Sequence, residues 1–174
     1  VIRGLGYNRI VTLNEGVRQE GNQWGDEHGI EIDQFSADRI EVLKGPASLF
    51  YGSDAMGGVI NILEQTPANL GSINGEWVSQ FSTNDRLFSN SAMVEGNQNN
   101  WIWRARGTYK TAASYHTPTE WVYNSGFDEK NLSLMAGLVK KWGYSHLHFS
   151  SFNTKIGMID GTRDSATNQF IDYK

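Results

Sequence analysis

Side chains able to bind a metal gather in one short segment near the N-terminus. They are Asp26, Glu27, His28, Glu31 and Asp33, and Trp24 precedes them with a flat aromatic ring. Carboxylate oxygens and imidazole nitrogens are common metal ligands, so direct contact with a metal or a haem is conceivable. The spacing matches no defined ligand code such as HExxH, and a solvated loop is the simpler interpretation. We take Trp24, Asp26 and His28 as candidate ligand-binding residues.

Two further groups of polar residues lie later in the chain. His146 and His148 are two positions apart, which puts both on one face of a strand. They either bind a metal or simply line that face. Arg104, Arg106 and Lys110 form a basic row. This row either attracts an anionic chelate or, as we expect, pairs with carboxylates of the N-terminal region.

No residue pattern indicates catalysis. A phosphate-binding glycine loop with its lysine is absent, and no Ser/His/Asp set has a recognisable elbow. The absence of cysteine excludes a disulfide framework, a zinc ribbon and a cysteine nucleophile. The net charge of -4 comes from intermixed charges and gives no reason to expect a nucleic-acid partner. We therefore expect neither an enzyme, nor a cofactor, nor a resident metal.

Composition leaves the structural class open. A length of 174 residues allows about one domain. The sequence is 39% hydrophobic, as in a soluble protein, yet it holds 6 Trp, 7 Tyr and 8 Phe. Membrane β-barrels hide their apolar residues in alternation, so low mean hydropathy does not exclude them. No apolar run approaches the roughly 20 residues that a membrane-spanning helix needs.

The sequence pattern of the first 66 residues is typical of a small α+β unit. Short apolar runs at residues 10–13, 40–43 and 59–62 alternate with glycine-rich turns, which predicts short buried strands. Pro46 can begin a short helix that Gly52 ends. The expected core of the sheet consists of Ile40, Val42, Val59, Ile60 and Ile62.

From residue 72 onward the apolar pattern has a period of two. The clearest strand is predicted at residues 101–110, about the length that a tilted strand needs to cross a bilayer. One of its faces carries Trp101, Trp103, Ala105, Gly107 and Tyr109, and the other carries Ile102, Arg104, Arg106, Thr108 and Lys110. Aromatic residues at both ends of the apolar face are typical of the interfacial girdles of barrels.

Further strands are predicted at residues 73–81, 87–95, 131–139 and 144–151. A connection at residues 96–100, a long polar loop at 110–130 and a short turn at 141–143 join them, and residues 160–174 are expected to trail off without strands. About five strands are therefore expected. Bacterial single-chain barrels need at least about 8, so these strands cannot close a barrel alone.

The run from Arg39 to Ile62, RIEVLKGPASLFYGSDAMGGVINI, closely resembles the signature that ends the plug of TonB-dependent receptors. Upstream, residues 2–6 (IRGLG) and 13–18 (LNEGVR) resemble two other plug segments in the expected order, with Asn14 where the family more often has Asp. The structural residues of this motif are Gly45, Pro46, Tyr51, Gly52, Gly57 and Gly58.

The resemblance covers residues 1–66 and implies two domains. Residues 1–66 are expected to be the C-terminal part of a plug, a small α+β domain with a short mixed sheet. Residues 67–174 are expected to be the first antiparallel strands of a transmembrane β-barrel. The chain would then be a piece of a larger bacterial outer-membrane protein.

The resemblance also implies a function, which is TonB-dependent uptake of a scarce metal chelate. A ferric siderophore is the leading expectation, and haem, cobalamin or another metal complex are alternatives. The partners would be outer-membrane lipid, the extracellular chelate and TonB, which would act through a box upstream of Val1. Arg39, Glu41 and Lys44 are expected to lock the plug to the barrel wall, unless they are ordinary surface charges.

A soluble β-rich binding or adhesion module is the rival interpretation. It predicts that the apolar strand faces pack against each other, whereas a barrel presents them to lipid.

Overall fold

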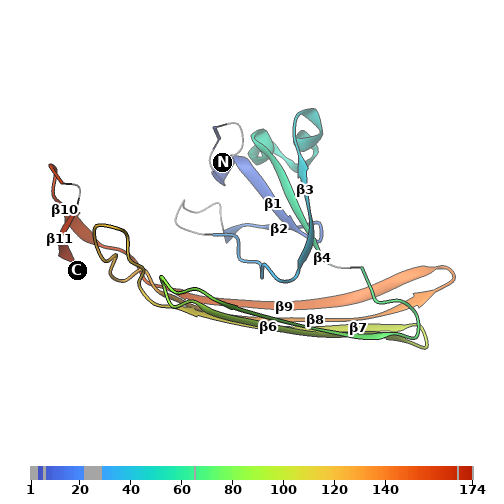
Figure 1. Ribbon diagram of the computed structural model, residues 1–174. Coiled ribbons are helices and arrows are strands. Elements are labelled where there is room, and N and C mark those ends of the chain that lie inside the picture. Colours follow the sequence, from blue (N-terminus) through green and yellow to red (C-terminus); the bar gives the residue numbers. More distant parts are fainter. Residues whose placement is uncertain (1–3, 6, 22–28, 65, 168, 174) are drawn as a thin grey trace. The chain divides into compact units, whose positions relative to one another are not determined.

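The computed structural model describes residues 4–5, 7–21, 29–64, 66–167 and 169–173 (Figure 1). The chain divides into two compact units, Val1–Thr66 and Pro67–Lys174. None of the helices in these described ranges is long and apolar enough to cross a membrane.

The first unit is built on a four-stranded mixed sheet. Its strands are β1 (Ile10–Asn14), β2 (Val17–Gln19), β3 (Ala37–Leu43) and β4 (Gly58–Glu64), in the spatial order β2-β1-β4-β3. β1 and β4 run parallel, while β1/β2 and β3/β4 are antiparallel. A 3₁₀ turn, η1 (Tyr7–Arg9), leads into β1. The short mixed sheet implied by the resemblance is confirmed.

Two 3₁₀ helices connect β3 to β4. The first, η3 (Pro46–Tyr51), begins at the predicted proline and is followed by Gly52 at φ 98°, a backbone conformation that residues with a Cβ rarely adopt. The second, η4 (Ser53–Met56), was not predicted, since four residues are too few to show an apolar period. The second helix places Ala55 against β1 and β4 of the sheet.

The core of this unit lies on one face of the sheet. Val11, Leu13, Ala55 and Val59 form it, and Leu43 packs against it. The prediction that Ile40 and Val42 belong to the core was wrong, because they are 58% and 49% exposed. Both lie on the opposite face, and β3 is an edge strand, so only one neighbouring strand shields them.

The second unit contains five antiparallel strands in sequence order. They are β5 (Ile73–Phe81), β6 (Phe88–Gln98), β7 (Trp101–Ala112), β8 (Phe127–Lys140) and β9 (Gly143–Ile156). The number of strands agrees with the prediction, and β5 has the predicted bounds. In Figure 1 the long strands run side by side in a gently curved sheet. β5 and β9 are its edges among the described residues.

A small hairpin follows the five-stranded sheet. Its strands are β10 (Gly161–Arg163) and β11 (Phe170–Tyr173), where no strand was expected. Strands this short fall below what an alternation pattern can reveal.

The two ends of the five-stranded sheet differ in their connections. At one end the turns are tight: Asn99 and Asn100 have φ of 52° and 67°, as in the type I′ turns that suit hairpins. At the same end β8 turns into β9 through Lys141 and Trp142. At the other end the connections are longer, residues 82–87 and 113–126. The connection predicted at 96–100 is shorter than expected because the β6/β7 ladder continues to Gln98 and Trp101.

In this sheet the apolar face is the exposed one, the reverse of the usual arrangement in a soluble protein. On the central strands β6, β7 and β8 the polar face, which includes Arg104, Arg106 and Lys110, is largely buried. The apolar face is exposed, with Trp77 77% and Leu147 83% accessible. In the described part of the chain the apolar faces of these strands do not meet, so the sandwich predicted by the rival interpretation was wrong. A broad exposed apolar face requires an apolar surrounding.

One glycine of the apolar face supplies a direct test of this sheet. A Cβ at Gly96 would lie 2.6 Å from the Trp103 ring on the paired strand, whereas a Cβ at Gly107 would meet nothing within 4 Å. We expect Gly96→Ala to destabilise the sheet by about 1–3 kcal/mol through overpacking. The temperature at which the full-length protein loses its folded electrophoretic mobility in SDS should fall. Gly107→Ala is the matched control, and equal shifts in both variants would contradict the close packing.

Candidate functional site

The predicted ligand-binding residues Trp24, Asp26 and His28 lie outside the described residues. Of the same acidic group, Asp33 is described and buried. Its Oδ1 accepts the Phe35 N–H at 3.1 Å, and its carbonyl accepts the Ser36 N–H at 3.0 Å and the Ser36 hydroxyl at 2.8 Å. Asp33 therefore shapes the turn that leads into β3, a structural role.

The proposed locking residues lie on and after the edge strand β3. Arg39 Nη2 is 3.0 Å from Glu41 Oε1, and the two side chains are 67% and 44% exposed. Lys44 is exposed as well. An exposed pair of this kind contributes about 0–1 kcal/mol to stability. Within the first unit these charges stabilise little, so they remain accessible for contact with another surface.

The glycines of the plug-like motif hold the two 3₁₀ helices in place. Gly45 and Gly58 have φ of 84° and 142°, next to Pro46 and at the start of β4. The Gly57 N–H donates to the carbonyl of Arg9 at 2.7 Å, and a Cβ there would lie 2.9 Å from that oxygen. Glycine at position 57 thus permits a close approach of two backbone segments.

Some side chains around the 3₁₀ helices form contacts within the first unit, and others are exposed. Arg18 Nη2 lies 2.6 Å from Asp54 Oδ2 and joins β2 to η4. This hydrogen bond from Arg18 lowers the pKa of Asp54 from its ordinary value. In contrast, Leu49, Phe50 and Tyr51 of η3 are exposed, Phe50 almost completely. The helix therefore presents a short apolar surface.

The basic row on the polar face of the second sheet is neutralised within that sheet. Arg104 Nη2 lies 2.6 Å from Glu95 Oε2, and both side chains are buried. Arg106 Nη1 lies 2.9 Å from Glu76 Oε1, and Lys110 Nζ lies 2.8 Å from Glu129 Oε1. All three cations stand on β7, and the carboxylates stand on β6, β5 and β8. The partners that the structure shows are carboxylates of the sheet itself, and pairing with carboxylates of the N-terminal region stays a prediction.

Hydrogen bonds complete the network around these ion pairs. Asn74 Nδ2 donates to Glu95 Oε1 at 3.0 Å, and Asn131 Nδ2 donates to Glu129 Oε1 at 2.7 Å. Arg106 Nη1 and the Thr108 hydroxyl both donate to the Ser91 hydroxyl oxygen, at 3.1 and 2.9 Å. Because each cation faces a carboxylate, the row is not a bare positive surface that would attract an anionic ligand.

The two histidines of β9 belong to the same polar face. His148 Nε2 and the Ser133 hydroxyl are 3.0 Å apart, and the His146 ring stacks on Tyr144 with centroids 5.7 Å apart. Among the residues that the structure describes, no group of three or more His, Asp or Glu side chains is arranged to hold a metal. These contacts favour the interpretation that the histidines line the polar face.

The longer connections carry a contact that no sequence pattern indicated. Glu120 Oε1 lies 3.2 Å from Arg163 Nη1, and Glu120 Oε2 accepts the Phe170 N–H at 2.9 Å. The Arg163 guanidinium lies 3.7 Å from the centre of the Phe170 ring. Glu120 therefore joins the β7–β8 connection to the β10–β11 hairpin. The partners are too far apart in sequence for spacing to suggest the contact.

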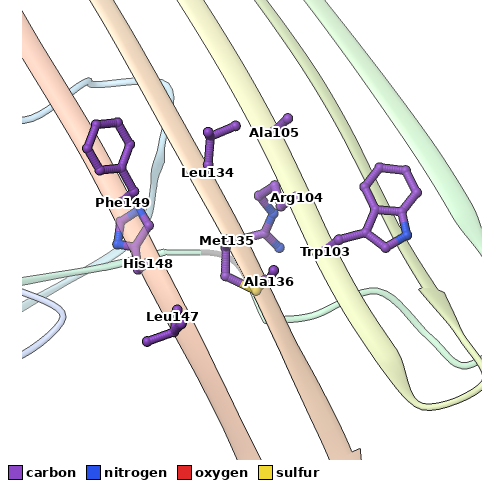
Figure 2. Close-up of a pocket in the computed structure, with 9 residues that line it drawn as sticks. All are labelled: Trp103, Arg104, Ala105, Leu134, Met135, Ala136, Leu147, His148 and Phe149. Carbon is purple, nitrogen blue, oxygen red and sulfur yellow. The ribbon is translucent and has the colours of Figure 1, made fainter.

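A shallow hollow of about 510 Å³ lies on the apolar face (Figure 2). Trp103, Leu147 and Phe149 stand around it, and the small side chains of Ala105 and Ala136 leave it open. Arg104 and His148, also drawn, belong to the polar face of the same strands. With an apolar lining and no charged group on its own face, the hollow suits acyl chains better than a polar ligand.

The buried pair predicts a large difference between single and double substitution. Arg104→Met leaves the Glu95 carboxylate buried without its cation, which should destabilise the sheet by about 3–5 kcal/mol. The double variant Arg104→Met/Glu95→Leu should recover most of that loss. Chemical unfolding of the full-length protein in lipid vesicles measures both, with Arg39→Met at the exposed pair as the control. A double variant as unstable as the single one would contradict the account.

Comparison with known proteins finds a known domain in the N-terminal part of the chain. The family model described as TonB-dependent Receptor Plug Domain matches residues 1–59. A hemin receptor of Yersinia pestis is 47% identical over 60 residues, covering 34% of this chain and 9% of that protein. An iron-regulated outer membrane virulence protein of Vibrio cholerae is 46% identical over 69 residues, covering 36% of this chain and 11% of that protein. The chain thus matches only about a tenth of the length of these relatives.

The fold of both units recurs in a solved structure. The ferric enterobactin receptor PfeA superposes with a TM-score of 0.65 and 19% identity, over 88% of this chain and 26% of that one. The family model matches the N-terminus, and the antiparallel strands that follow expose their apolar face. Together these observations lead to one assignment. Residues 1–59 therefore belong to the plug domain of the TonB-dependent receptors, relatives of which are named outer-membrane proteins, and antiparallel strands with the fold of a solved receptor follow them.

Proposed function

We propose that the protein to which this chain belongs imports an iron-containing chelate across the outer membrane. The observation that carries this proposal is the order of the two units, a plug domain followed directly by strands whose polar face is buried and charge-paired. The plug would occlude the pore, and the strands would form the first part of its wall. Uptake would require no bond to be made or broken.

The class of chelate is iron-related. Haem is the first candidate to test because the relative from Yersinia pestis is named a hemin receptor. A ferric siderophore, expected from the sequence, is the second candidate. Cobalamin, a cobalt complex, is the alternative outside the iron-related class. The plug loop with Trp24, Asp26 and His28 is proposed as the part of the ligand site that this chain contributes.

The plug would act as a bistable element. Ligand bound on the outside would favour a disturbed plug, and TonB, pulling on a box upstream of Val1, would complete the opening. The accessible charges of β3 and the short apolar surface of η3 are the features of the first unit suited to contact a barrel wall.

Growth with single transported compounds as the source of iron or of cobalamin tests the proposal. A host strain lacking the full-length gene should fail to grow on one of haem, ferric siderophore or cobalamin, and the gene supplied in trans should restore growth. His28→Ala should lower growth on that compound about tenfold or more if His28 binds the metal directly, since tenfold corresponds to about 1.4 kcal/mol. Normal growth of the deletion strain on all three compounds would refute uptake, and unchanged growth of His28→Ala would remove His28 from the site.

Charge substitutions test the proposed lock. Glu41→Lys should increase leakage of large antibiotics through the full-length receptor and reduce uptake, because the reversed charge would repel its partner on the wall. The exchange Arg39→Glu/Glu41→Arg keeps the internal ion pair but inverts both charges, so it should leak as well. Glu20→Lys, an exposed plug residue outside the motif, is the control. Wild-type behaviour of the exchanged variant would show that the two charges serve only each other.

A further inference from the structure

The apolar face of the five-stranded sheet contains one row that is entirely polar. The cross-strand register aligns Ser79, Asn90, Tyr109, Lys130 and Asn153, one residue from each strand. We call this set the polar row. Within the described residues, none of its side chains forms a hydrogen bond or an ion pair, and the one recorded contact is Lys130 Nζ at 5.9 Å from the Tyr109 ring centre.

The polar row marks a boundary on this face. The next rows towards the tight turns contain the large apolar side chains Trp77, Leu132, Leu134, Phe149, Trp103 and Leu147. Towards the longer connections the face becomes mixed. In outer-membrane barrels the longer loops are extracellular and the short turns are periplasmic. The polar row therefore lies where the apolar band meets the headgroups of the outer leaflet.

Two unpaired cations distinguish this boundary. Lys155 lies one row further out, diagonally from Lys130, and both ammonium groups are exposed. Neither takes part in an ion pair in the described part of the chain, although Asp128 pairs with Lys155 in the backbone register. In contrast, all three cations of the polar face have a carboxylate within 3 Å. The outward cations thus lack the partner that each inward cation has.

We propose that Lys130 and Lys155, with the Tyr109 hydroxyl and the amides of the polar row, bind the phosphorylated headgroup of a lipid in the outer leaflet. Ammonium groups compensate phosphate charge, and amides and hydroxyls suit the remaining headgroup oxygens. The acyl chains would lie along the apolar rows below. The proposal rests on the membrane placement of the sheet and is independent of which chelate is transported.

Native mass spectrometry of the full-length receptor tests this site. The protein is reconstituted in phosphatidylcholine nanodiscs containing either bis-phosphorylated lipid A or its dephosphorylated form, and retained lipid is counted after release. Lys130→Gln/Lys155→Gln should lower retention of the phosphorylated form about thirtyfold, since each of the two cations near an anionic surface contributes about 1 kcal/mol. The control Lys140→Gln/Lys141→Gln, at the tight-turn end, should retain it as the wild type does.

Three results would overturn the proposal. They are equal retention of the phosphorylated lipid by the wild type and Lys130→Gln/Lys155→Gln, equal retention of both lipid forms by the wild type, and an equal loss in the control variant. Both substituted lysines are exposed and unpaired, so the variant should fold, and unchanged heat-modifiable migration verifies this. Failure of uptake with intact lipid retention would count against the transport proposal alone.

Discussion

The structure of the second unit depends on the alternation of side chains along a β-strand. Successive residues point to opposite faces, so a strand can be charged on one face and apolar on the other. In β7 this alternation places Arg104, Arg106 and Lys110 on the buried face. Burial of charge is tolerated there because each cation has a carboxylate on a neighbouring strand. The apolar side chains consequently face outward, where only lipid makes them favourable.

A row of basic residues could either hold the plug or attract an anionic ligand, and the ion pairs bear on both roles. Cations compensated within the wall do not need the plug for their stability, and they do not present a bare positive surface to a ligand. Contacts that hold the plug would have to come from groups that its own unit leaves accessible, such as Arg39 and Glu41 on the edge strand β3.

Much of the fold was predictable because it follows from local patterns. The period of two gave five strands, and the proline and glycine around η3 gave its bounds. The exposure of Ile40 and Val42 was missed because it depends on β3 lying at the edge of its sheet, which is a long-range pairing. The partners of the basic row were missed for the same reason, since Arg106 reaches over β6 to Glu76 on β5.

The candidate site was less predictable than the fold. Glu120 and Arg163 meet through connections whose conformation no short pattern specifies. The polar row could not be predicted from the sequence, because it takes one residue from each strand and therefore depends on the register of all five strands. Asp33 belongs to the group of side chains able to bind a metal, and its contacts shape a turn, which its spacing in the sequence did not indicate.

The most direct test of the central claim is the lipid accessibility of the two faces in the full-length receptor in a bilayer. Single cysteines at Ala105 and Leu134 on the apolar face, and at Thr108 and Ser133 on the polar face, would each carry a nitroxide label. Electron paramagnetic resonance then measures collision with oxygen, which concentrates in the acyl region. The account predicts strong collision at 105 and 134 and weak collision at 108 and 133. Equal collision at all four positions, or the reverse pattern, would contradict a wall whose apolar face meets lipid.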